Sequence, residues 1–205
     1  MSGVGLIVLA AGASTRMGTP KQLLKYQQQS LLCHLVEEAT SSVCNPVIVV
    51  VGAHAERIKP ELELLDVHTV ENLDWSNGMS TSIRSGIEAL NVIKPDVEAV
   101  VLMLCDQPFV STQIINRLVE SYWATGQQIV ASEYAGTWGV PALFNSTLFS
   151  KLTTLNGTAG ARQVIKQYAQ EVFTIAFPEG ALDLDTPEDY ERFLAKNQIG
   201  FQHSR

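Results

Sequence analysis

The segment of residues 4–24, VGLIVLAAGASTRMGTPKQLL, decides the fold of this 205-residue chain. Its opening run, Val4 to Leu9, is apolar and rich in branched residues, which is typical of a strand buried on both faces of a sheet. Small residues follow and let backbone N–H groups approach an anion, while Arg16 and Lys21 add donors for phosphate. The spacing matches neither the dinucleotide-binding fingerprint nor the P-loop. An anion-binding turn and an ordinary strand-to-helix connection with surface charges both fit this stretch.

Length and composition favour one domain. Apolar residues make up 46% of the chain and charged residues 17%, which is enough to bury one good-sized core. The sequence has no repeat, low-complexity tract or flexible linker that would mark a boundary. We therefore expect a single domain over residues 1–205, with a short C-terminal tail over roughly residues 197–205.

Charge and cysteine content limit the partners and the compartment. A net charge of −7 disfavours a broad nucleic-acid-binding surface, because phosphate backbones are held mainly by clustered lysine and arginine. The first apolar run is too short to span a bilayer, and Arg16 follows it, which is the wrong order for a signal peptide. Three cysteines without paired spacing favour reduced thiols. We expect a cytoplasmic protein that binds neither nucleic acid nor membrane.

Further apolar runs alternate with segments of helical period. Strands are expected at residues 4–9, 47–51, 99–104, 129–132 and 172–177. Helices are expected after Ser30, over residues 79–90, after Ser111 and after Thr186. The last has the clearest start, with Pro187 at its first position and Asp189 at its third. This alternation predicts an α/β layered fold with a mainly parallel sheet.

Acidic residues follow one predicted strand and precede the last predicted helix. In a parallel sheet, ligands bind beyond the carboxyl ends of the strands. Asp106 lies at such an exit and could hold Mg²⁺, although capping or turning the chain would also explain it. Asp183 and Asp185 point to one side of an extended chain and could join it, or could simply favour the positive end of the next helix. Cys105 has no histidine partner nearby in sequence, so we expect a small buried residue there.

Six motifs occur in the order seen in one enzyme family. They are LAAGASTRMGTPKQLL at residues 9–24, NGMSTSIRSGI at 77–87, LCDQP at 104–108, GVPALF at 139–144, GTAGAR at 157–162 and LDTPEDY at 184–190. In this order they resemble the MobA/MocA-like nucleotidyltransferases, and most closely the molybdenum cofactor cytidylyltransferase branch. The resemblance spans nearly the whole chain. It implies a three-layer Rossmann-like fold, the one shared with nucleotide-diphospho-sugar transferases.

The same resemblance implies an activity and a set of site residues. The activity is Mg²⁺-dependent transfer of CMP from CTP to the phosphate of molybdopterin, with release of pyrophosphate and a molybdoenzyme as one recipient of the product. The implied catalytic residues are Arg16, Lys21 and Asp106, and the implied metal ligands are Asp106 and Asp185, with Asp183 in reserve. The implied nucleotide-binding residues are Leu9, Ala10, Ala11, Gly12, Gly78 and Ser80. The implied acceptor-binding residues are Gly139, Pro141, Gly160 and Arg162. Met79 is expected in the core.

Two positions leave the substrates open. Ala11 gives the LAAG form of the cytidylyl branch, whereas the guanylyl branch more often has LAGG, so CTP is favoured over GTP. Thr158 stands where the family pattern GDxGAR has aspartate, so the acceptor could differ or a secondary contact could be absent. The alternatives are guanylyl transfer from GTP to molybdopterin, nucleotidyl transfer to another phosphorylated acceptor, and a non-catalytic pterin-cofactor-binding protein. A dehydrogenase is disfavoured because the dinucleotide fingerprint is missing.

Overall fold

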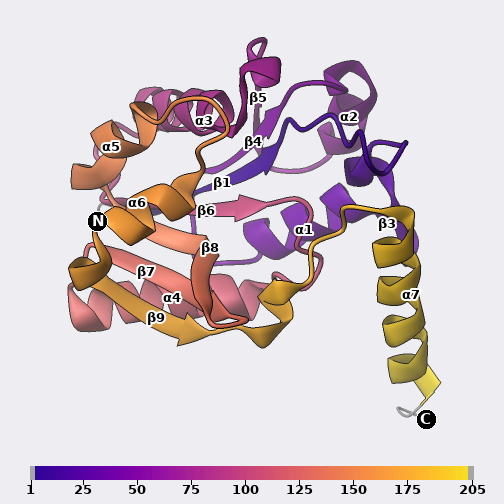
Figure 1. Ribbon diagram of the computed structural model, residues 1–205. Coiled ribbons are helices and arrows are strands. Elements are labelled where there is room, and N and C mark those ends of the chain that lie inside the picture. Colours follow the sequence, from indigo (N-terminus) through magenta and orange to yellow (C-terminus); the bar gives the residue numbers. More distant parts are fainter. Residues whose placement is uncertain (1–2, 203–205) are drawn as a thin grey trace.

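A computed structural model describes residues 3–202, with side chains described through residue 195. Its centre is a seven-stranded sheet with the strand order β5-β4-β1-β6-β8-β7-β9 (Figure 1). The strands are β1 (Val4–Ala10), β4 (Val47–Val51), β5 (His68–Glu71), β6 (Ala99–Leu104), β7 (Ile129–Tyr134), β8 (Thr137–Asn145) and β9 (Val172–Ala176). All run parallel except β8, which pairs antiparallel with both of its neighbours. A separate two-stranded ribbon joins β2 (Lys25–Tyr26) to β3 (Gln29–Ser30).

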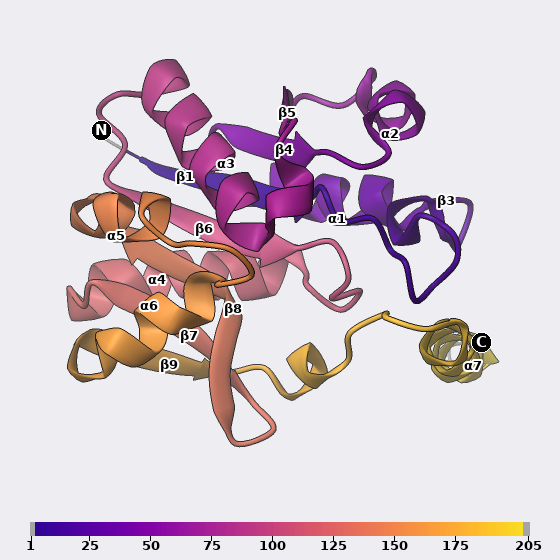
Figure 2. The ribbon, with the colours of Figure 1, turned by 45° about the horizontal axis from the view of Figure 1, so that its top comes forward.

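Helices cover both faces of the sheet and complete three layers. They are α1 (Leu31–Thr40), α2 (Ala55–Leu62), α3 (Met79–Ile93), α4 (Thr112–Thr125), α5 (Phe149–Thr153), α6 (Ala161–Gln167) and α7 (Pro187–Gln202). Buried side chains of α1, α2 and α4 share one core with the sheet, and those of α3, α5 and α6 share the other. Figure 2 shows α3, α5 and α6 in front of the sheet, with α1 and α4 behind it.

The alternation of side chains along β1 builds both cores at once. Leu6 and Val8 lie in the core under α1 and α4, whereas Ile7 and Leu9 lie in the core under α3. Successive side chains of a strand point to opposite faces, so a central strand needs apolar residues at every position. All seven residues of β1 are buried, as the opening run of the sequence predicts.

The expected helix starts after Ser30, Ser111 and Thr186 are confirmed by capping contacts. The Ser30 hydroxyl accepts a hydrogen bond from the N–H of Cys33, at 3.2 Å, at the start of α1. At α7, the Thr186 hydroxyl accepts from the N–H of Asp189, while the Asp189 carboxylate accepts from the N–H of Thr186. This reciprocal pair is a capping box, which satisfies N–H groups that the helix itself cannot pair.

All five expected strands and all four expected helices are present, and the mainly parallel α/β sheet is confirmed. The sequence did not reveal β5, β8, α2, α5 or α6. Strand β8 contains Pro141, and proline within a run argues against a central strand because it cannot donate to a ladder. Helix α7 extends to Gln202, through most of the expected tail, and residues 203–205 lie outside the described residues. Within residues 3–202, no helix combines the length and the apolar character needed to cross a bilayer.

The sheet brings the exits of β1 and β6 side by side. These strands are parallel neighbours in which Leu9 pairs with Leu104, so the loop after β1 lies next to Asp106. The segment before α7 also reaches this edge, because the N–H of Leu184 donates to the carbonyl of Asp106 at 2.9 Å. Three segments distant in sequence therefore meet at one edge of the sheet.

Candidate active site

The loop after β1 folds back on itself before α1. The Ser14 carbonyl accepts hydrogen bonds from the N–H groups of Met17, at 3.0 Å, and Gly18, at 3.2 Å. The Ser14 hydroxyl accepts a further one from the N–H of Lys21, at 3.0 Å. Gly18 has a φ of 74°, a left-handed conformation that glycine adopts without steric cost. These contacts place Lys21 beside the carboxyl ends of β1 and β6, next to Asp106.

Lys21 joins two carboxylates that come from different segments. Its Nζ lies 2.9 Å from Oδ2 of Asp106 and 3.0 Å from Oδ1 of Asp185. Arg16 binds the second oxygen of Asp185, Oδ2, at 2.8 Å. The Lys21 side chain is 13% exposed, whereas that of Arg16 is 71% exposed. The structure thus gathers the two predicted cations and the two predicted metal ligands into one network, with Lys21 at its centre.

The network sets the charge states of its neighbours. Burial alone would lower the pKa of Lys21, but the Asp106 charge and hydrogen bonds to both carboxylates outweigh it and raise that pKa. Lys21 therefore stays charged at neutral pH. Asp183 is exposed at its surface but partly desolvated by its surroundings, and this desolvation, together with the charges of Asp106 and Asp185, raises its pKa to about 6. Burial also raises the pKa of the Cys105 thiol to about 12, so this residue is the small buried one that we expect rather than a thiolate nucleophile.

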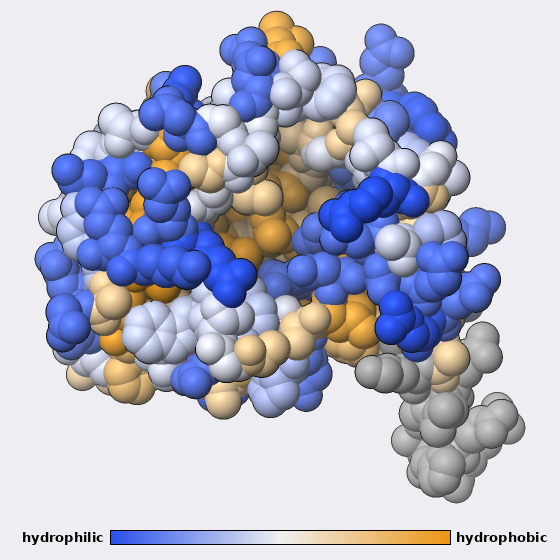
Figure 3. Space-filling view, viewed as in Figure 1, coloured by the Kyte–Doolittle hydropathy of each residue, from blue (hydrophilic) through white to orange (hydrophobic). Residues whose placement is uncertain are grey.

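A cavity of about 520 Å³ opens beside the network. The end of β1 and the loop after it contribute Leu9, Ala11, Gly12, Ala13, Thr15, Lys21 and Gln22 to its wall. The turn before α3 and the first turn of that helix contribute Trp75, Ser76, Gly78, Met79 and Ser82, and the remainder is Leu104, Cys105, Asp106 and Thr158. The space-filling view shows this face of the molecule hollowed near its centre, with apolar residues at the floor and polar residues around it (Figure 3). The size and the mixed lining suit a small-molecule ligand.

The turn before α3 packs against the loop before α6 beside the cavity. Gly78 has a φ of 109°, and a Cβ there would lie 2.2 Å from the carbonyl oxygen of Gly157. That oxygen also accepts hydrogen bonds from Ser80, at 3.3 Å from its N–H and 2.9 Å from its hydroxyl. Only glycine allows so close an approach at position 78.

The predicted nucleotide-binding residues divide into two groups. Leu9, Ala11, Gly12 and Gly78 line the cavity, whereas Ala10 and Ser80 are buried and do not belong to its described lining. The prediction of a core position for Met79 is wrong. Met79 is the first residue of α3, and its side chain is 39% exposed at the cavity wall. The motifs do not single out Ser82 or Gln22, because spacing marks the turns but not the side chains that face inward.

The predicted acceptor-binding residues lie on β8 and at the start of α6. They are Gly139, Pro141, Gly160 and Arg162, and the described lining of the cavity includes none of them. A Cβ at Gly139 would lie 2.2 Å from the hydroxyl of Tyr134, so this glycine makes room for that ring. Pro141 is buried in the sheet, while Arg162 is exposed and donates to the hydroxyl of Thr137. These four residues therefore lie outside the described wall of the cavity beside Lys21.

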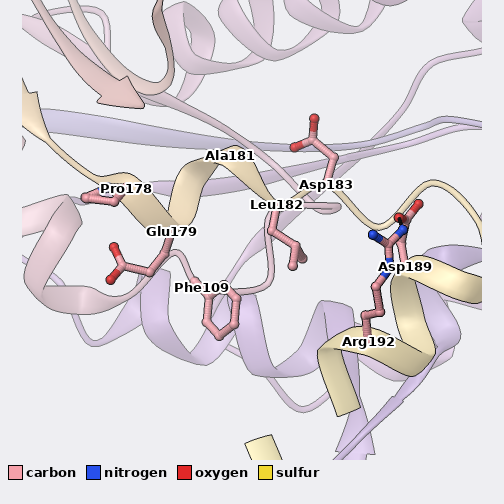
Figure 4. A pocket seen from close by; sticks show the side chains of 8 residues that line it. All are labelled: Phe109, Pro178, Glu179, Ala181, Leu182, Asp183, Asp189 and Arg192. Atoms are coloured by element: carbon pink, nitrogen blue, oxygen red, sulfur yellow. Dashed lines mark hydrogen bonds and ion pairs between the residues drawn. The ribbon is translucent and has the colours of Figure 1, made fainter. Parts of the chain in front are cut away.

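A second cavity, of about 550 Å³, lies under the segment that leads to α7 (Figure 4). Its described lining is Phe109, Pro178, Glu179, Ala181, Leu182, Asp183, Asp189 and Arg192. Arg192 and Asp189 pair at 2.6 Å. Figure 4 shows the Asp183 carboxylate pointing away from Phe109. It is Asp185, and not Asp183, that the described ion pairs join to the Lys21 ammonium together with Asp106.

Asp106 and Asp185 have the chemistry of a site for a divalent cation. One oxygen of each binds the same ammonium, and Oδ1 of Asp106 is buried without a hydrogen-bond partner in the described structure. Mg²⁺ needs only one or two protein carboxylates, because water and substrate phosphate supply its other ligands. Among residues 3–195, no three or more His, Cys, Asp or Glu side chains are grouped to hold a metal. A cation at this site would therefore depend on oxygens of a ligand.

A family model described as "MobA-like NTP transferase domain" matches residues 6–172. The chain belongs to this family. The match includes the loop after β1 and Asp106 but ends before Asp185. Membership in the MobA-like family confirms the resemblance carried by the six motifs and makes the cavity a candidate nucleotide site.

Relatives of this MobA-like chain carry names of several kinds. Nicotine blue oxidoreductase of Paenarthrobacter nicotinovorans is 29% identical, over 92% of this chain and 95% of the relative. Purine catabolism protein PucB of Bacillus subtilis is 30% identical, over 90% and 93%. Molybdenum cofactor cytidylyltransferase of Escherichia coli is 23% identical, over 93% and 95%. Only the third of these names is that of a nucleotidyltransferase, and the three names differ in the activities and substrates they suggest.

Solved structures have the same fold. Rv0371c of Mycobacterium tuberculosis, in complex with manganese, has a TM-score of 0.78 and 29% identity, over 95% of this chain and 99% of that one. A nucleotidyl transferase of Methanothermobacter has a TM-score of 0.80 and 20% identity, over 94% and 96%. These likenesses confirm the Rossmann-like nucleotidyltransferase fold.

Proposed function

We propose that this protein transfers CMP from CTP to the phosphate of a molybdopterin-type acceptor and releases pyrophosphate. The observation that carries the proposal is the Lys21 ammonium, held between Asp106 and Asp185 beside the cavity at the end of β1. The Escherichia coli relative named molybdenum cofactor cytidylyltransferase supports the reaction. Ala11, in the LAAG form of the cytidylyl branch, supports CTP.

In this reaction an acceptor phosphate oxygen attacks the α-phosphorus of CTP. The new oxygen–phosphorus bond forms as the bond to pyrophosphate breaks, so charge moves onto the leaving group. Lys21 and Arg16 would stabilise that charge, and backbone N–H groups of the loop after β1 would hold the triphosphate. Positioning and charge neutralisation supply most of the catalysis, and no protein nucleophile is needed.

Asp106 and Asp185 would hold a Mg²⁺ ion, which would supply positive charge to offset that of the triphosphate. Manganese in the Rv0371c structure supports a divalent ion in the family. Without ligands, the two carboxylates share Lys21. On nucleotide binding, Lys21 would turn from the carboxylates toward phosphate oxygens. Arg16, being mostly exposed, would exchange Asp185 for phosphate in the same way.

The names of the relatives suggest more than one kind of substrate. The two relatives of 29% and 30% identity carry names unrelated to molybdenum cofactor transfer. GTP in place of CTP, or a different phosphorylated acceptor, would use the same cations and carboxylates. We propose a cytoplasmic setting, in keeping with three buried free cysteines, and delivery of the product to a molybdoenzyme.

Pyrophosphate release with each of the four nucleoside triphosphates, with and without molybdopterin, tests the proposal. We expect release with CTP and molybdopterin together in Mg²⁺, and little from either alone. Release with GTP instead would replace the cytidylyl assignment with a guanylyl one. A carrier role would be supported if no nucleotide gave pyrophosphate while Lys21→Ala and Asp106→Ala proteins still delivered the pterin cofactor to a recipient enzyme.

A further inference from the structure

Gln22 is a polar side chain with no exposed surface, placed directly behind the loop after β1. Its Nε2 donates hydrogen bonds to two backbone carbonyls, that of Ala10 at 2.7 Å and that of Gly12 at 3.0 Å. Its Oε1 accepts one from the hydroxyl of Ser14, at 3.4 Å. Both amide protons are thus used on carbonyls two residues apart in the same loop.

These bonds decide which end of each peptide faces the cavity. In a trans peptide the C=O and N–H groups point in opposite directions. The bonds that follow Ala10 and Gly12 are both trans. With their carbonyls turned toward Gln22, the N–H groups of Ala11 and Ala13 point the opposite way. Ala11 and Ala13 both line the cavity.

We propose that Gln22 is a positioning residue for triphosphate recognition. It holds the N–H groups of Ala11 and Ala13, rather than the carbonyl oxygens of the same peptides, toward the phosphate oxygens. Donors fixed in advance toward an anion strengthen its binding, whereas a carbonyl in their place would repel it. The proposal rests on a nucleoside triphosphate occupying the cavity, and it is independent of the acceptor.

Two near-isosteric variants separate this role from that of a packing side chain. Gln22→Glu keeps size and shape but loses both donors and sets a carboxylate against two carbonyls. Gln22→Met keeps the length without any hydrogen bond. The matched control is Asn145→Asp, which makes the same amide-to-carboxylate change at the opposite edge of the sheet, where Asn145 donates to the Tyr122 hydroxyl at 2.7 Å.

Equilibrium binding of CTP and of inorganic tripolyphosphate to each folded protein provides the test, with folding checked by thermal denaturation. We expect Gln22→Glu to weaken both ligands by about tenfold or more, and Gln22→Met by about threefold to tenfold. Asn145→Asp should leave both within about twofold of wild type. Tripolyphosphate has no base, so a matching loss for the two ligands assigns the effect to phosphate recognition.

The pH dependence adds a signal that packing alone would not give. When the carboxylate introduced by Gln22→Glu takes up a proton, it regains one donor, so the affinity of that variant relative to wild type should rise from about pH 8 to about pH 6. Folded Gln22 variants that bind both ligands like wild type would overturn the positioning role and leave the proposed function intact. Failure of wild type to bind either ligand would overturn both.

Discussion

The two halves of the sheet build their ligand-facing surfaces in different ways. In the half formed by β5, β4, β1 and β6, all strands run parallel, and the exits of β1 and β6 place the loop after β1 beside Asp106. In the half formed by β8, β7 and β9, the antiparallel β8 carries its candidate residues inside the sheet and beside a hairpin. A site formed by the ends of adjacent parallel strands can be predicted from the order of strands in the sequence. A site on an antiparallel strand such as β8 cannot be predicted in this way.

The largest expected effect belongs to the parallel half. Lys21→Met should lower kcat for pyrophosphate release by about a hundredfold to a thousandfold with every acceptor, because a largely buried cation facing the transition-state charge is lost. Steady-state assays with saturating CTP would measure it. Lys25→Met, at an exposed lysine of β2, is the matched control. A loss below about tenfold would remove Lys21 from the catalytic set.

The same substitution should have the opposite effect on metal binding without nucleotide. Removing the ammonium leaves Asp106 without its cation and leaves Asp185 paired with Arg16 alone. We expect Lys21→Met to bind Mn²⁺ about tenfold more tightly than wild type, as measured by titration of the free ion's electron paramagnetic resonance signal. Unchanged or weaker binding would argue against a cation site at these carboxylates, and Lys25→Met again serves as the control.

Arg162 tests the other half of the sheet. Arg162→Ala should raise the KM for the acceptor by about fivefold to tenfold, because a guanidinium can bind a phosphate through two parallel hydrogen bonds. The KM for CTP should stay within about twofold. Arg117→Ala, at an exposed arginine of α4, is the control. An equal rise in both KM values would mean that Arg162 also contributes to nucleotide binding. The acceptor site would then not be confined to the half of the sheet that contains β8.

The smallest expected effect concerns stability. The pKa of Asp183 is raised from 3.8 to about 6, so the folded state binds its proton more tightly than the unfolded state does. This carboxylate therefore destabilises the fold as pH rises from about 4 to about 6, and the penalty persists at neutral pH. After allowance for solvent screening, Asp183→Asn should stabilise by about 1 kcal/mol at pH 7.5.

Thermal denaturation at two pH values would measure this difference as a shift in Tm. The gain should vanish below about pH 4, where Asp183 is protonated in both states. Asp96→Asn changes an exposed aspartate and should give little shift at either pH. A gain of equal size at low pH would mean that the effect does not arise from the charge of Asp183.

The sequence predicts β1, β4 and β6 of the parallel half because their evidence is local, whereas the mostly exposed β5 lacks an apolar run and is not predicted. Continuous apolar runs mark the buried strands, and the residues just after β1 and β6 must meet once those strands pair. Asp185 lies far along the chain from β1 and β6, and the bond between Leu184 and the Asp106 carbonyl helps bring it to the site, so its selection over Asp183 needed the family resemblance.

Other features leave too little trace in the sequence. Strand β8 is not predicted because it contains Pro141, and proline usually breaks a central strand. Gln22 bonds mainly to backbone carbonyls, which any residue provides, so no partner side chain in the sequence points to its role. Met79 has the spacing of a core residue, yet it begins its helix and so projects over the cavity. Position along an element, rather than residue type, decides these cases.

The position of Asp185, near the end of the chain and just before α7, has a consequence for the folding of the newly made protein. The two cations follow the first strand made on the ribosome, but the carboxylate that pairs with Arg16 follows the last strand of the sheet. Domains form from the N-terminus as synthesis proceeds. In a nascent chain Arg16 would thus lack its carboxylate and Lys21 would have only Asp106, so the complete charge network would form only after the final segment docks.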